Sequence, residues 1–238
     1  MRWPELSLRP TTFPALMVFR FASFSLLLLT LPGVQTALGE DFSLEEVERP
    51  PEALAEPLKS SLNPAGVRVL NGQGNPWCEI WVRREIADSG QPASPEAVYP
   101  AFHSGVLLGL MRFPEGGTDF RGLPVGKGTY TMRYGVIPQD GNHVGAAPIV
   151  DFVLLIPLSE DTLAPDAQLS SEELVELSKK ASGTHHPTVI NLAFPPDSVE
   201  RPILENYESD HWILSLPLNQ KSGGQLPVSI IVHGQAAG

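Results

Sequence analysis

The segment RYGVIPQDGNHVG, residues 133–145, gathers side chains that could coordinate a metal ion. Asp140 and His143 supply a carboxylate and an imidazole, and Asp151 follows on the next predicted strand. His185 and His186 add two imidazoles further along the chain. Zinc and copper accept carboxylate oxygens and imidazole nitrogens, so these five residues form a candidate divalent-metal site. No H-x-H or H-E-x-x-H spacing fixes them, and adjacent histidines on a strand point to opposite faces.

The same segment also fits a ligand site that uses no metal. Its candidate contacts are the polar and aromatic side chains Arg133, Tyr134, Gln139, Asp140, Asn142 and His143. A loop of this length in a compact domain is usually either functional or mobile. In the alternative interpretation, Asp140 and Asn142 hydrogen-bond their own loop backbone, and His143 lies at the surface.

Asp151 stands inside the apolar run IVDFVLL, where a carboxylate needs a partner. We expect an ion pair with Arg133 on the neighbouring strand, because buried charges are normally paired. The functional alternative makes Asp151 a general base beside His143, or a metal ligand.

Familiar catalytic patterns do not occur in the sequence. It has no G-x-S-x-G nucleophile elbow, no P-loop and no dinucleotide-binding glycine pattern. Cys78 is the only cysteine, so no intramolecular disulfide forms, and its alternation with Ile80 and Val82 places it on the core face of a strand. The sequence therefore favours a protein that is not an enzyme.

Three tryptophans in the predicted domain could instead form a platform that stacks on sugar rings. They are Trp77, Trp81 and Trp212. The competing interpretation, which large aromatic side chains usually follow, is burial in the core or packing on the sheet.

The motif R-Y-G-x-x-P-Q-D-G-N-H-x-G, with LPVGKGTYTM before it and DFVLLIP after it, resembles an uncharacterised group of secreted bacterial β-sandwich proteins. The resemblance covers roughly residues 76–194. The run VGKGTY departs from the simpler L-P-x-G-x-Y turn of related small domains. The resemblance implies a secreted β-fold and implies no activity.

Short apolar runs separated by Gly, Pro, Asn and Asp predict the elements that position these residues. The expected strands span residues 67–70, 78–86, 105–113, 129–137, 149–157, 188–194, 211–218 and 227–234. This spacing predicts a mainly β protein, an antiparallel β-sandwich of Ig-like or jelly-roll-like type. One covering helix is expected near residues 171–182, with Ser170 and Glu173 as a capping box and Gly183 as its stop.

The N-terminal residues predict export from the cytoplasm. Residues 1–39 combine basic residues, a short apolar core and a small-x-small site, as a cleavable signal peptide does. An acidic, proline-rich arm is expected at residues 40–66, and a single β-sandwich domain at 67–238. Cleavage removes three basic residues and one acidic residue, which changes the net charge from −11 to −13. Such a charge disfavours nucleic acid and anionic membranes as partners.

The sequence therefore predicts a secreted or periplasmic, non-catalytic binding or accessory module that uses loops at one end of the sandwich. Its ligand would be a small molecule, a glycan or a protein. One alternative is a metal-binding protein or metal-dependent enzyme centred on the PQDGNH loop. A carbohydrate-binding module is the other alternative.

Overall fold

The computed structural model describes residues 41–51, 54–88, 90, 92–137, 147, 149–207 and 211–234. The expected signal peptide, residues 1–39, lies outside these ranges, as do residues 138–146 of the PQDGNH loop. None of the described helices is long and apolar enough to span a membrane.

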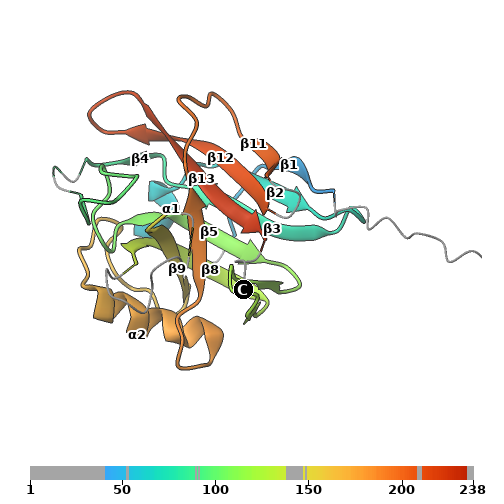
Figure 1. Cartoon of the computed structure of the whole chain (residues 1–238), viewed down its shortest axis with the longest axis horizontal. Coiled ribbons are helices and arrows are strands. Elements are labelled where there is room, and N and C mark those ends of the chain that lie inside the picture. The colour runs from blue at the N-terminus through green and yellow to red at the C-terminus, as the bar shows by residue number, and fades with distance from the viewer. Residues whose placement is uncertain are drawn as a thin grey trace, which may run out of the picture. The chain divides into compact units, whose positions relative to one another are not determined.

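Strands dominate the described chain, which confirms the mainly β prediction (Figure 1). The strands are β1 (Ser43–Val47), β2 (Gly66–Leu70), β3 (Pro76–Val82), β4 (Glu85–Ile86), β5 (Leu107–Phe113), β6 (Gly117–Thr118), β7 (Pro124–Val125), β8 (Gly128–Val136), β9 (Asp151–Pro157), β10 (Val189–Ala193), β11 (Ile203–Tyr207), β12 (His211–Gln220) and β13 (Gln225–His233). The two helices are α1 (Glu56–Ser61) and α2 (Ser171–Ser182).

Eleven of the strands form one strongly curled half-barrel sheet rather than the two separate sheets of the expected sandwich. Its path is β1-β2-β3-β5-β8-β9-β10-β13-β12-β11, and β6 and β7 form a small sheet of their own. The continuity arises at β10, whose residues 189–191 pair with β9 while Leu192 and Ala193 pair with β13. The sheet is also mixed, since β4 pairs with β12 in parallel.

The main core fills the inside of the curl. In β8, Tyr130, Met132 and Tyr134 point into it, while Thr131 and Arg133 alternate to the other face. Side chains from β12 and β13, such as Leu214 and Ile230, reach the same core from the opposite side of the curl. We call the side that contains β8 and β9 the N-terminal wall and the side that contains β12 and β13 the C-terminal wall. Burial of this shared apolar surface holds the two walls together.

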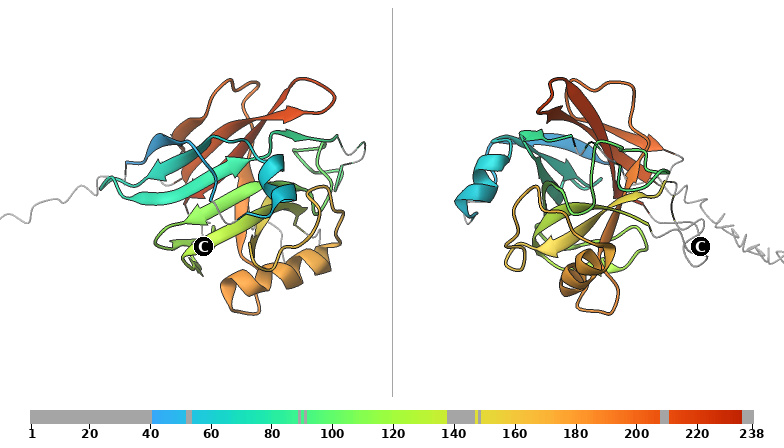
Figure 2. Two further views of the ribbon diagram at one scale, coloured as in Figure 1. Left: turned by 180° about the vertical axis from the view of Figure 1, so that it is seen from behind. Right: turned by 90° about the vertical axis from the view of Figure 1, so that its left-hand side faces the viewer.

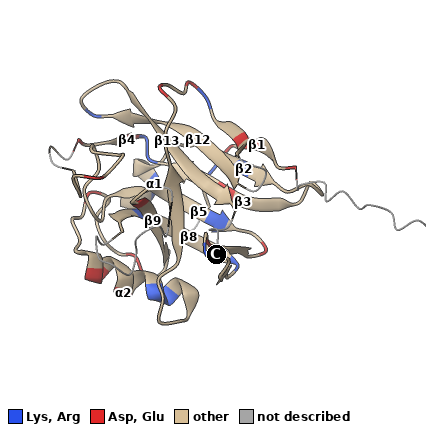
Figure 3. Cartoon of the chain, viewed as in Figure 1, with Lys and Arg blue, Asp and Glu red and all other residues tan. Residues whose placement is uncertain are grey.

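Helix α2 covers the outer face of β8 and β9, as predicted, with the expected boundaries (Figures 1 and 2). Both views of Figure 2 place α2 on the side of the fold opposite β12 and β13. The Ser170 side chain accepts a hydrogen bond from the Glu173 backbone N–H, which confirms the capping box, and Gly183 ends the helix with φ 63°. Figure 3 shows acidic residues at the start of α2 and lysines near its end, the arrangement that the helix dipole favours.

The segment expected to be an extended acidic arm instead contributes structure to the fold. It forms β1, which adds an edge strand beside β2, and α1. Leu62 and Leu54 are buried against Trp81, whose side chain lies on the outer face of β3. Covering this tryptophan removes a large apolar surface from water, which the acidic composition of the segment does not reveal.

Candidate functional site

Arg133 pairs with Asp161. The sequence had predicted Asp151 as its partner, and that prediction is wrong. Its guanidinium donates to both Asp161 carboxylate oxygens, at 2.6 and 2.8 Å, and both side chains are 1% exposed. The same guanidinium also donates to the backbone carbonyls of Gly105, Leu163 and Ala164. Every direction of the fork is therefore occupied, and Arg133 fastens the chain after β9 to the outer face of β8.

Asp151 instead accepts three hydrogen bonds inside the core. The backbone N–H groups of Val98 and Tyr99 donate to it at 2.9 and 3.1 Å, and the Tyr134 hydroxyl donates at 2.6 Å. Burial, and then this bond to the carboxylate, raise the pKa of the Tyr134 hydroxyl far above its ordinary value. These donors give Asp151 and Tyr134 a structural explanation, so neither contact suggests a general base or a ligand site.

The Tyr99 hydroxyl continues this polar network across the core. It donates to the carbonyl of Ala193 at 2.7 Å and accepts from the backbone N–H of Ser229 at 2.9 Å. Burial raises the pKa of this hydroxyl as well. The network therefore ties the chain before β5 to the bend where β10 passes from one wall to the other.

The structure does not bring the described candidate metal ligands together. His185 and His186 are exposed in the turn before β10, whereas Asp151 is buried at the start of β9. Because β9 and β10 are antiparallel, with Val189 opposite Leu154, the histidines lie at the other end of the strand pair from Asp151. Within the described ranges, no group of three His, Cys, Asp or Glu side chains could hold a metal ion.

Gln139, Asp140, Asn142 and His143 lie outside the described residues, so their roles remain predictions. The loop that contains them leaves the sheet at Ile137 and returns at Val150, and the Ile137 N–H donates to the Val150 carbonyl at 2.8 Å.

Of the three tryptophans proposed as a platform, Trp81 is buried, and Trp77 and Trp212 are half-buried against the core. Trp81 is buried beneath the α1 segment, and the Trp77 indole N–H donates to the Val232 carbonyl at 2.7 Å. Trp212 packs against Phe42, with ring centroids 5.4 Å apart. Cys78 lies wholly inside the core, as predicted, and burial raises the pKa of its thiol. Cys78 and Trp81 are therefore inaccessible to a ligand.

A different pair of aromatic side chains is exposed, on the outer face of the C-terminal wall. Phe194 is 67% exposed just after β10, and Tyr207 is 57% exposed at the end of β11. Both line a cavity of about 660 Å³, which we call the outer groove. Its described lining is Ala193, Phe194, Pro195, Pro196, Glu205, Asn206, Tyr207, His211, Ile213, Ser215 and Ile231.

Strand register explains the floor of the outer groove. Ile213 lies opposite Ile231, and both pack with Ala193 and with Phe120 from the segment between β6 and β7. The Phe120 ring also lies 5.4 Å from the His211 ring. The groove thus has an apolar floor, aromatic sides and polar groups at its rim, the composition of many small-ligand sites.

The outer groove lies at the same end of the sheet as the flanks of the PQDGNH loop, in which the sequence predicted a ligand or metal site. Asn191 pairs with Phe152, so Ala193 and Phe194 leave β10 at the end of the sheet where Asp151 begins β9. The flanks of the PQDGNH loop, Ile137 and Val150, lie at this same end.

Sequence reasoning missed the outer groove because its parts come from four separate strands, β10, β11, β12 and β13. One local signal was present in the run LAFPPD, residues 192–197. There an aromatic residue follows a buried strand and precedes two prolines, which end the strand pairing and leave the ring exposed.

Comparison with protein-family models, with curated proteins and with solved structures found no match to this chain.

Proposed function

We propose that this protein is an extracytoplasmic, non-catalytic binding module for saccharides, with its ligand site in the outer groove. The observation that carries the proposal is the exposure of Phe194 and Tyr207 on the sides of one cavity. Large aromatic side chains normally lose most of their surface on folding, so an exposed pair suggests a surface that a ligand covers.

The chemistry of the groove suits a sugar ring in particular. A pyranose has apolar C–H faces, which stack on aromatic rings, and equatorial hydroxyls, which need hydrogen-bonding partners. Phe194 and Tyr207 offer the rings, and the exposed side chains of Glu205 and Asn206 offer an acceptor and an amide at the rim. The floor of Ile213, Ile231 and Ala193 can pack against the apolar face of a sugar.

The location and kinship that we propose rest on the sequence. The leader pattern of residues 1–39 supports export, and the R-Y-G-x-x-P-Q-D-G-N-H-x-G motif supports kinship with the secreted bacterial β-sandwich group. Because the core lies between two facing walls of the curled sheet, a ligand can bind on the outer face of one wall and on its end loops.

Titration with soluble oligosaccharides tests this function. Cellohexaose, xylohexaose and chitohexaose are titrated into the purified protein by calorimetry, and at least one is expected to bind saturably. Phe194→Ala and Tyr207→Ala should each weaken that binding about five- to tenfold, because a lost aromatic contact costs about 1–1.5 kcal/mol.

Leu123→Ala serves as the matched control, because Leu123 is 38% exposed and does not line the groove. It should bind the saccharide as the wild type does. Repeating the titration with EDTA separates this function from the metal alternative on Asp140 and His143. Loss of binding in EDTA, or unchanged binding by both aromatic variants, would contradict the proposal.

A further inference from the structure

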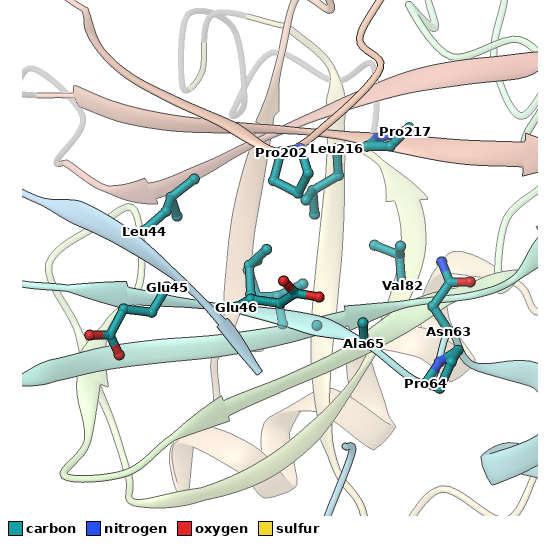
Figure 4. A pocket seen from close by; sticks show the side chains of 13 residues that line it. Leu44, Glu45, Glu46, Asn63, Pro64, Ala65, Val82, Pro202, Leu216 and Pro217 are labelled. Carbon is teal, nitrogen blue, oxygen red and sulfur yellow. The ribbon is translucent and has the colours of Figure 1, made fainter. Parts of the chain in front are cut away.

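A second cavity lies where the curled sheet is open, between its two edge regions (Figure 4). We call it the mouth cavity, and its volume is about 440 Å³. One side comes from β1, β2 and β3, and the other from β12 and the residue before β11. The side chains used in the argument below are Leu44, Glu46, Val67, Ile80, Val82 and Leu216.

Strand register places one carboxylate on the apolar inner face of this cavity. Glu46 lies opposite Val67, and Val67 lies opposite Ile80, so these three side chains share a face. Figure 4 shows the Glu46 carboxylate in the space between the two walls, with Leu44 beside it on the same strand. Glu45 also lines the cavity, but its side chain lies on the opposite face of β1, where it pairs with Arg68.

Neighbouring carboxylates on this wall already have cationic partners. Glu45 lies 3.5 Å from the guanidinium of Arg68, and the buried Glu79 is paired with both Arg68 and Arg112. Within the described residues, Glu46 has neither an ion-pair partner nor a hydrogen-bond partner for its side chain. Glu46 is exposed at the mouth of the cavity, so its carboxylate can contact a cationic group of a ligand that enters there.

We propose that the mouth cavity binds a small aliphatic ammonium compound, with the ammonium group on Glu46 and the hydrocarbon part against Leu44, Val82 and Leu216. Charge complementarity supports this ligand class, because the chain carries a net charge of −11 and attracts cations. The volume lies within the range of small-ligand pockets. This site is independent of the outer groove.

An inward-pointing charge on an edge strand can also prevent edge-to-edge association, and this is the competing explanation for Glu46. Protection of the edge needs the charge alone, whereas ligand binding needs the charge and the apolar wall together. The two explanations therefore predict different behaviour when the charge and the wall are altered separately.

Two probes of matched length separate the contributions, namely protonated n-hexylamine and neutral n-hexanol. Both are titrated into the purified protein by NMR, and the amine is expected to bind more tightly. Glu46→Gln should weaken the amine about two- to fivefold, the effect expected of an exposed ion pair, and leave the alcohol unchanged. Leu44→Ala should weaken both probes.

Glu45→Gln is the matched control, since it removes one negative charge from the same strand, at a side chain that is paired with Arg68 on the face opposite to Glu46, and should bind both probes as the wild type does. Thermal unfolding verifies that each variant is folded. The proposal is overturned if the wild type binds no amine saturably, or if Glu46→Gln and Glu45→Gln bind the amine equally. Self-association of Glu46→Gln without amine binding by the wild type would assign the edge-protection role instead.

Discussion

Arg133 and Asp151 lie on neighbouring strands but face opposite sides of the sheet. Arg133 lies opposite Leu154, three residues from Asp151, and an odd offset along a strand reverses the face. The alternation within each strand could be read from the sequence, but their register depends on the loop between them. Arg133 therefore pairs with Asp161, and Asp151 accepts a hydrogen bond from Tyr134. The sequence indicated neither partner.

Replacing Arg133 with methionine tests its structural role. We expect Arg133→Met to lower the free energy of unfolding by about 3–5 kcal/mol, because it leaves the Asp161 carboxylate buried without its cation. Urea unfolding measures the loss. Adding Asp161→Asn to this variant should recover part of it, and saccharide binding should not change. A loss below about 1 kcal/mol would show that Arg133 does not hold this part of the fold.

Three buried groups, the Cys78 thiol and the Tyr99 and Tyr134 hydroxyls, should make the free energy of unfolding depend on pH. Burial raises the pKa values of Cys78, Tyr99 and Tyr134 in the folded state. Above about pH 8.5 for the thiol and about pH 10 for the hydroxyls, the unfolded chain releases protons that the native state retains. At pH 7 all three groups are protonated in both states, so their titration should not change the free energy of unfolding. Above about pH 8.5 for the thiol and about pH 10 for the hydroxyls, the free energy of unfolding should fall by up to about 1.4 kcal/mol per pH unit for each group.

Urea unfolding at intervals from pH 7 to 11 measures this dependence. Cys78→Ala should remove the decline between about pH 8.5 and 10 and leave the later decline in place. Stability that stays constant up to pH 11 would contradict the burial of these groups.

At the scale of elements, the sequence predicted what local patterns determine. Helix α2 followed from its capping box and glycine stop, and the central strands followed from alternation. The edge strands β1 and β11 were missed, because SLEEV and ILENY lack a regular apolar alternation and become strands through pairing with β2 and β12.

Close contact between β5 and β3 depends on Gly109. A Cβ atom there would lie 2.1 Å from the Trp81 carbonyl oxygen, which is backbone and cannot rotate away. We therefore expect Gly109→Ala to lower the free energy of unfolding by about 1–3 kcal/mol or more, as overpacking does. Gly126→Ala is the control, since its nearest neighbour is the Tyr130 hydroxyl at 3.5 Å. Equal thermal unfolding midpoints for the two variants would contradict the close contact.

At the scale of the whole molecule, β12 separates the two candidate sites. Ile213 and Ser215 face the outer groove, and Leu216 faces the mouth cavity from the other side of the sheet. Neither cavity could be predicted from the sequence, because each combines strands far apart in the chain. The change of partner within β10, which makes the sheet continuous, is likewise a long-range property.

Methyl NMR of the isoleucines during titration with the saccharide that binds is the most direct test of the proposed function. We predict that the resonances of Ile213 and Ile231, on the floor of the outer groove, shift saturably, while that of Ile80 in the mouth cavity does not. Shifts at Ile80 without shifts at Ile213 and Ile231 would contradict saccharide binding in the outer groove.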